Sequence, residues 1–167
     1  MNSIYESLIR NDRLRETSFP NRNLTTEMLS DKKRILLSSA FRRLQTKAQV
    51  FSLEKNAAIR SRLTHTLEVA LFGELIAEQI FDNLLEKGSV TEKLRRAFIL
   101  SVENACLLHD IGNPPFGHLG EFAIRAWFEK KEKEMKRIWK SHGIRERTPE
   151  IYLDGFKNFD GNAQGFR

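Results

Sequence analysis

The chain has 167 residues, 40% of them hydrophobic, and its 28 Lys and Arg against 22 Asp and Glu give a formal charge of +6. The length favours one domain with one core, and the single cysteine, Cys106, excludes a disulfide framework. Neither a secretory signal nor a stretch of about 20 apolar residues is evident, so we expect a cytoplasmic protein with no membrane partner.

The first predicted elements are a polar arm and one helix. We expect residues 1–29 to be loosely structured, with at most one short helix at 4–10. Ser30 and Asp31 can cap the next helix, because short polar side chains accept hydrogen bonds from the first free amides of a helix. Apolar residues then recur at helical spacing to about residue 47.

Two long helices are predicted after a short extended link at 49–53. The first, 63–85, carries an apolar stripe that we expect to face the core, and His65 in its first turn then lies near the core side. The stripe consists of Leu67, Leu71, Leu75 and Ile76. The second helix opens with a capping box, Ser89-Val-Thr-Glu92, and runs to Leu108.

A turn-rich loop separates these helices from the last predicted one. Helical periodicity is interrupted by Gly112, Pro114, Pro115 and Gly117. The loop therefore covers 111–117, and a helix begins near His118 and exposes alternating charges at 129–137. We expect residues 142–159 to be a mobile connection rather than a strand. No β-alternation persists long enough to predict a sheet, so the predicted class is all-α.

The adjacent pair His109-Asp110 at a helix end is the most informative motif of the sequence. Imidazole and carboxylate can hold a divalent cation, but two side chains seldom hold a catalytic ion alone, so His65 is the natural third ligand. Such a mixed set suits Mn²⁺, Fe²⁺, Co²⁺, Ni²⁺ or Zn²⁺ better than an all-oxygen Mg²⁺ cage, and the identity of the divalent metal ion stays open.

The surrounding residues indicate phosphate-ester hydrolysis. A bound cation lowers the pKa of its water to about 7 and neutralises phosphate oxygens. His118 is the candidate general acid, and Glu121, three residues later on the same helical face, is its orienting partner. A carboxylate that only complements the helix dipole is an equally good interpretation of Glu121. Arg60 and Arg62, near His65, offer forks for phosphate oxygens, although such pairs are usually solvated.

Three separated blocks, 42–65, 109–121 and 159–165, resemble the deoxyguanosine triphosphate triphosphohydrolase family of the HD superfamily. The resemblance implies an HD-domain helical bundle that hydrolyses a dNTP, with dGTP as the first candidate, to deoxynucleoside and inorganic triphosphate. By position, its site residues are His65, His109 and Asp110 for the metal, His118 and Glu121 for catalysis, and Gln49, Val50, Arg62 and Asn162 for the substrate. The first two substrate residues would contact the deoxyribose, and the last two would address phosphate or the metal-activated water.

One departure from the family pattern concerns the metal site. The resemblance implies a fourth ligand, an aspartate that lies beyond the Asn-Ala-Gln motif, where this chain has ended. We therefore expect an N-terminal fragment of a longer enzyme, with an arm at 1–29 and an incomplete HD domain at 30–167. Alone, this chain is expected to bind metal weakly and to turn over poorly.

Two alternatives stay open. The first is a noncatalytic module that binds single-stranded nucleic acid or a partner subunit. The positive charge favours anionic partners, and some relatives bind single-stranded DNA and assemble as hexamers. The missing aspartate favours this module, and the resemblance implies a homo-oligomer in either case. The other is an HD phosphatase or phosphodiesterase for a different nucleotide. Salt dependence of binding distinguishes the module, and the reaction product distinguishes the enzymes.

Overall fold

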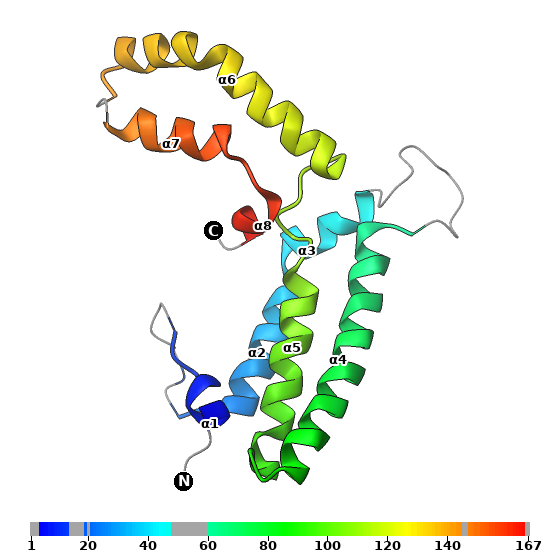
Figure 1. Ribbon diagram of the computed structural model, residues 1–167. Helices are drawn as coiled ribbons and strands as arrows, with labels where there is room; N and C mark the ends of the chain where they lie inside the picture. Colours follow the sequence, from blue (N-terminus) through cyan, green and yellow to red (C-terminus); the bar gives the residue numbers. More distant parts are fainter. Residues whose placement is uncertain (1–3, 14–18, 20, 48–59, 145–146, 166–167) are drawn as a thin grey trace.

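The computed structural model describes residues 4–13, 19, 21–47, 60–144 and 147–165 (Figure 1). Its elements are α1 (Ile4–Leu8), α2 (Leu24–Leu37), α3 (Ser39–Arg42), the 3₁₀ turn η1 (Arg43–Thr46), α4 (Arg62–Glu86), the 3₁₀ turn η2 (Glu92–Leu94), α5 (Arg95–Leu108), α6 (Gly117–Ser141), α7 (Arg147–Lys157) and α8 (Gly161–Gly165). These described residues contain no β-strand, which confirms the all-α class. None of the described helices combines the length and apolar character that a bilayer crossing requires. The predicted link at 49–53 lies outside the described residues.

Helices α4 and α5 form an antiparallel hairpin, and α2 packs beside α5 (Figure 1). Two clusters of buried apolar side chains lie along this three-helix unit. The cluster next to α3 and η1 contains Ile35, Phe41, Leu44, Ala70 and Leu107. The cluster at the other end contains Phe81, Val90, Leu94 and Ala97. Because Leu107 belongs to the first cluster, the core holds the end of α5 from which His109 and Asp110 follow.

The long helix predicted at 63–85 is confirmed as α4, but its predicted core face is wrong. The stripe expected inside consists of Leu67, Leu71, Leu75 and Ile76, whose exposed fractions lie between 47% and 59%. The buried face instead consists of Arg62, Thr66, Ala70, Ala77 and Phe81. The reason is close packing: a Cβ on Gly73 would lie 2.5 Å from the Cys106 Sγ of α5. Around Gly73 only small side chains on α4 fit so close to α5, whereas Phe81 is buried in the cluster at the other end of the helix.

The predicted start of the next helix is also wrong, although the short helix near the N-terminus is confirmed as α1. Helix α2 begins earlier, because the Asn23 side chain accepts a hydrogen bond from the Thr26 N–H and caps the helix there. Ser30 and Asp31 lie inside α2, and Asp31 accepts hydrogen bonds from Arg13 at 3.0 Å. The helix therefore crosses the boundary expected between residues 29 and 30.

The helix predicted to end at Leu108 is confirmed as α5, whereas its predicted capping box is wrong. The preceding turn η2 is N-capped by Thr91 rather than Ser89. The Glu92 carboxylate accepts a hydrogen bond from Arg95 Nε at 2.6 Å instead of reaching back to Ser89. Arg95 also pairs with two carboxylates of α4, Glu78 and Asp82. This ion cluster fixes the start of α5 against α4.

Residues 142–159, expected to be a mobile connection, contain helix α7, so that prediction is wrong. Helices α6 and α7 form a second hairpin that extends away from the three-helix unit (Figure 1). Leu153 of α7 is buried, and the Phe156 ring stacks on Phe128 of α6 with centroids 4.3 Å apart. Tertiary packing of an apolar face thus makes a helix of a segment that Pro149 and Gly155 appeared to interrupt.

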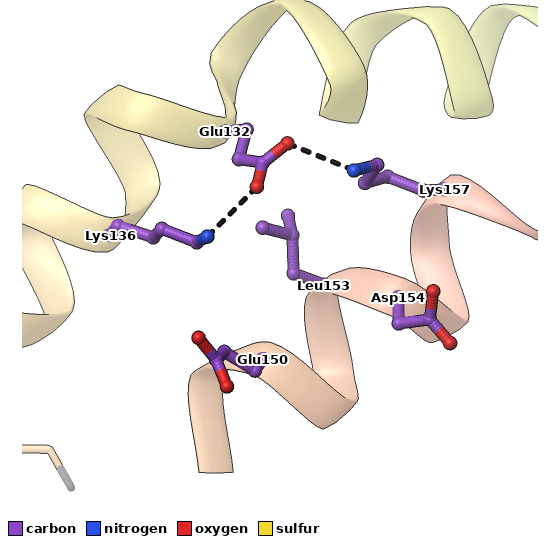
Figure 2. Close-up of a pocket in the computed structure, with 6 residues that line it drawn as sticks. All are labelled: Glu132, Lys136, Glu150, Leu153, Asp154 and Lys157. Atoms are coloured by element: carbon purple, nitrogen blue, oxygen red, sulfur yellow. Dashed lines mark hydrogen bonds and ion pairs between the residues drawn. The ribbon is translucent and has the colours of Figure 1, made fainter. Parts of the chain in front are cut away.

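Ion pairs add to the contact between α6 and α7 (Figure 2). The Glu132 carboxylate of α6 pairs with the Nζ of Lys136 in the same helix and with the Nζ of Lys157 in α7, each at an N–O distance of 2.9 Å. Lys136 first and then Lys157 lower the pKa of Glu132 to about 2. The carboxylate therefore stays ionised well below neutral pH and holds both ammonium groups. This pairing also neutralises part of the charge of the outer helix.

A double-mutant cycle at Gly73 and Cys106 tests the close packing of α4 on α5. Gly73→Ala alone should destabilise the chain, because overpacking costs about 1–3 kcal/mol and exceeds the gain of roughly 1 kcal/mol in helix propensity. In a Cys106→Ala background the same change should be neutral or stabilising. Urea unfolding followed by circular dichroism measures both effects. Additivity of the two changes within about 0.5 kcal/mol would contradict the contact.

Candidate metal centre

The three predicted metal ligands converge in the structure. His65 lies in the first turn of α4, and His109 and Asp110 lie in the turn that follows α5. One ligand atom from each residue lies within 4.8 Å of the other two. The two imidazole rings meet edge to face, with centroids 5.4 Å apart and an interplanar angle of 72°. The antiparallel hairpin produces this meeting, because it places the beginning of α4 beside the end of α5.

His109 is oriented by a backbone contact. Its Nδ1 lies 2.7 Å from the Cys106 carbonyl oxygen. Since a carbonyl oxygen can only accept, Nδ1 carries a proton, and in the neutral imidazole Nε2 then has the lone pair. A hydrogen bond on the second ring nitrogen is the usual way to fix the tautomer and orientation of a ligating histidine. His109 is thus prepared to coordinate through Nε2.

The two oxygens of Asp110 have different surroundings. Oδ1 accepts hydrogen bonds from Arg62 Nη1 at 3.1 Å and from the Asn113 side-chain amide. Oδ2 is buried, has no hydrogen-bond partner, and lies 3.7 Å from His109 Nε2. A buried carboxylate oxygen without a partner is costly, and a cation between Asp110 and the imidazoles would satisfy it. The residues therefore fit a divalent metal ion.

His118 and Glu121 form the second predicted pair of the site. His118 Nδ1 lies 2.9 Å from Glu121 Oε2, and their side chains are 96% and 7% exposed. The Gly161 N–H donates to Glu121 Oε1 at 2.9 Å. The hydrogen bond from His118, and next that from Gly161, lowers the pKa of Glu121. An ionised Glu121 therefore holds the His118 ring by Nδ1 and leaves Nε2 facing outward.

Helix α8 brings the last predicted residue to the site. Gly161, at its start, packs against the 109–113 turn so closely that an added Cβ would collide with the Asn113 side chain. Asn162 consequently lies beside His109 at a pocket of about 280 Å³. This pocket is lined by Ala105, Leu108, His109, Asn162 and Gly165. Gln49 and Val50 lie outside the described residues, so the structure places neither of them.

Arg62 lies at the metal centre as a partner of Asp110, and its predicted phosphate contact stays a prediction. Its side chain is buried and its guanidinium is paired with Asp110. The neighbouring Arg60 is exposed and pairs with Glu68 at 3.2 Å. The sequence predicted neither the ion pair of Arg62 with Asp110 nor the hydrogen bonds that Asn113 and Gly161 make to Asp110 and Glu121. The Asp-x-x-Asn spacing was the one available signal for Asn113, and it was equally typical of a turn.

Comparisons with known proteins agree with this geometry. Residues 62–158 match the model of the HD domain family. The chain is 53% identical over 165 residues to the deoxyguanosinetriphosphate triphosphohydrolase of Yersinia pseudotuberculosis, covering 86% of the chain and 33% of that protein. The enzyme of the same name from Yersinia enterocolitica is 52% identical over 164 residues, with 86% and 32% covered.

A third relative comes from Pseudomonas aeruginosa and is named "Probable deoxyguanosinetriphosphate triphosphohydrolase". It is 44% identical over 152 residues, which are 87% of the chain and 30% of that protein. The chain thus spans about a third of the length of the curated relatives it matches. The family match covers more than half of the chain and includes all three converging ligands, so the predicted resemblance is confirmed and the chain belongs to the HD-domain family.

Proposed function

We propose that this chain carries the metal centre and proton-donating pair of a metal-dependent dNTP triphosphohydrolase, with dGTP as substrate. The observation that carries the proposal is the buried, unpaired Oδ2 of Asp110, which lies 3.7 Å from His109 Nε2 in a cluster that also includes His65. His65, His109 and Asp110 would hold the ion. The names of the curated relatives support the substrate class.

The chemistry of a bound cation follows from this ligand set. When bound, a divalent cation supplies a Lewis acid for phosphate oxygens and activates water for attack. Two imidazoles and one carboxylate suit Mn²⁺, Fe²⁺, Co²⁺, Ni²⁺ or Zn²⁺ better than Mg²⁺. Arg62 orients the Asp110 carboxylate through Oδ1, so that Oδ2 stays available.

Proton donation is the role proposed for His118. Hydrolysis at the α-phosphate breaks the bond to the 5′-oxygen, which leaves with the deoxynucleoside and must gain a proton, while the triphosphate stays intact. His118 Nε2 would supply this proton, since Nδ1 is engaged by Glu121. The Glu121 carboxylate fixes the orientation of this imidazole, as the carboxylate does in other acid–base pairs. Glu121 is thus the orienting partner.

Substrate contacts are proposed for residues around the centre. Asn162 shares a pocket with His109, which supports a contact with the nucleotide or with attacking water. The phosphate contact of Arg62 and the deoxyribose contacts of Gln49 and Val50 stay predictions from the family resemblance. Binding of single-stranded DNA and assembly into a homo-oligomer stay predictions on the same ground.

Removal of a ligand tests the metal centre. His109→Ala should weaken binding of Mn²⁺ by more than the roughly 10–100-fold that loss of an outer-shell partner costs. Isothermal titration in the absence of nucleotide measures this loss. His142→Ala is the matched control, because His142 is an exposed histidine at the end of α6. Equal Mn²⁺ affinity of the two variants would rule out the centre.

Product analysis tests the reaction. With the chain in excess over dGTP, even slow turnover is measurable by ion chromatography of the phosphate products. The expected products are deoxyguanosine and triphosphate, and His118→Ala should slow their release by about 10²–10⁴-fold without changing Mn²⁺ affinity. Pyrophosphate or orthophosphate as the first product would instead indicate another phosphohydrolase. An unchanged rate in His118→Ala would remove His118 from the mechanism.

A further inference from the structure

Lys47 makes two contacts that no predicted role explains. It follows η1, and its backbone carbonyl accepts a hydrogen bond from the Arg62 N–H at 2.9 Å. Its side-chain ammonium donates to the backbone carbonyl of Asn113 at 2.6 Å. One residue therefore contacts both the beginning of α4 and the turn after α5.

These two segments carry the three ligand candidates. Arg62 begins α4, the helix whose first turn contains His65. Asn113 ends the turn that contains His109 and Asp110, and its side chain donates to Asp110 Oδ1. Metal affinity depends on holding such ligands within about 0.5 Å of their working positions. A link between the two segments controls that distance directly.

We propose that Lys47 is a positioning residue of the metal centre, which ties the His65 segment to the His109-Asp110 segment; the inference rests on the proposed function. The side chain acts through Asn113 and touches no ligand. The predicted site residues were assigned from side-chain chemistry. The role of Lys47 instead comes from its hydrogen bond to the backbone carbonyl of Asn113, a contact that a side-chain motif does not specify.

The electrostatic surroundings of Lys47 support a role beyond stability. Burial lowers the pKa of its ammonium, and the neighbouring Arg62 and Arg43 lower it further, whereas Asp110 partly raises it. Placing a partly buried cation next to two guanidinium groups costs folding free energy. Residues that keep a cost of this kind near a site are typical of function. A neutral side chain would serve simple packing better.

A direct contact with substrate phosphate is the competing role for Lys47. An ammonium has three donors, and the carbonyl of Asn113 uses one of them. The two roles differ in a measurable way, because a phosphate contact would leave binding of the metal alone unchanged. Titration with Mn²⁺ in the absence of nucleotide therefore separates them.

The test compares Lys47→Met, Lys47→Arg and Lys87→Met with the unaltered chain. Lys47→Met should raise the Kd for Mn²⁺ by about 10–100-fold, as expected for an outer-shell partner. Lys47→Arg keeps a cationic donor and should recover most of the affinity. Lys87→Met removes the same charge from the exposed far end of α4 and should leave the Kd unchanged. Circular dichroism checks that each variant keeps its helices.

The outcomes are distinct. If the unaltered chain binds no Mn²⁺, the proposed metal centre fails; if it binds and Lys47→Met binds equally well, only the role of Lys47 fails. A Lys47→Arg variant as weak as Lys47→Met would also overturn the proposal. Should Lys47→Met lose its helices, Lys47→Gln replaces it, and loss of fold in both would assign Lys47 to folding instead of positioning.

Discussion

The carboxylate of Asp110 joins the fold to the site. Arg62, the first residue of α4, and Asn113, beyond the end of α5, both donate to its Oδ1. Buried carboxylates require such partners, so removal of Arg62 would take away the opposite charge that is paired with Asp110. The same contacts leave Oδ2 unpaired and facing the imidazoles. The interaction that joins the beginning of α4 to the turn after α5 thus also leaves the oxygen on which metal binding would depend without a protein partner.

Glu121 has a comparable double role at the neighbouring pair. One oxygen accepts from His118 and the other from the backbone of Gly161, so the carboxylate connects the first turn of α6 with the start of α8. The position of Asn162 beside His109 depends on this connection, since α8 packs on the 109–113 turn through Gly161. The site is therefore assembled from the turn after α5, the first turn of α6 and the start of α8. The rest of the α6–α7 hairpin extends away from the three-helix unit (Figure 1).

The sequence predicted which segments are helical better than it predicted which side of a helix is buried. The two long helices and the turn between Leu108 and Gly117 follow from local patterns. The convergence of His65 with His109 and Asp110 was predicted from the ligand requirement of a metal ion and from the family resemblance, and the structure confirms it. The start of α2, the helix α7 and the buried face of α4 do not, because competing caps and tertiary packing decide them. Lys47 and Gly161 lie in the blocks that carry the resemblance, but their contacts were not predicted, because each contact involves a backbone atom and side-chain patterns do not specify it.

The wrong prediction for α4 has a physical cause that returns to the site. His65 meets His109 only if α4 and α5 pack closely, and the contact of Gly73 with Cys106 shows that small residues make this approach possible. Along this close contact the helix turns most of its large apolar residues away from α5, and Phe81 is buried beyond it. They form the exposed face of Leu67, Leu71, Phe72, Leu75, Ile76 and Ile80. A pattern that ranks residues by hydrophobicity selects this face as the core, whereas side-chain size decides which face a ligand-bearing helix can bury.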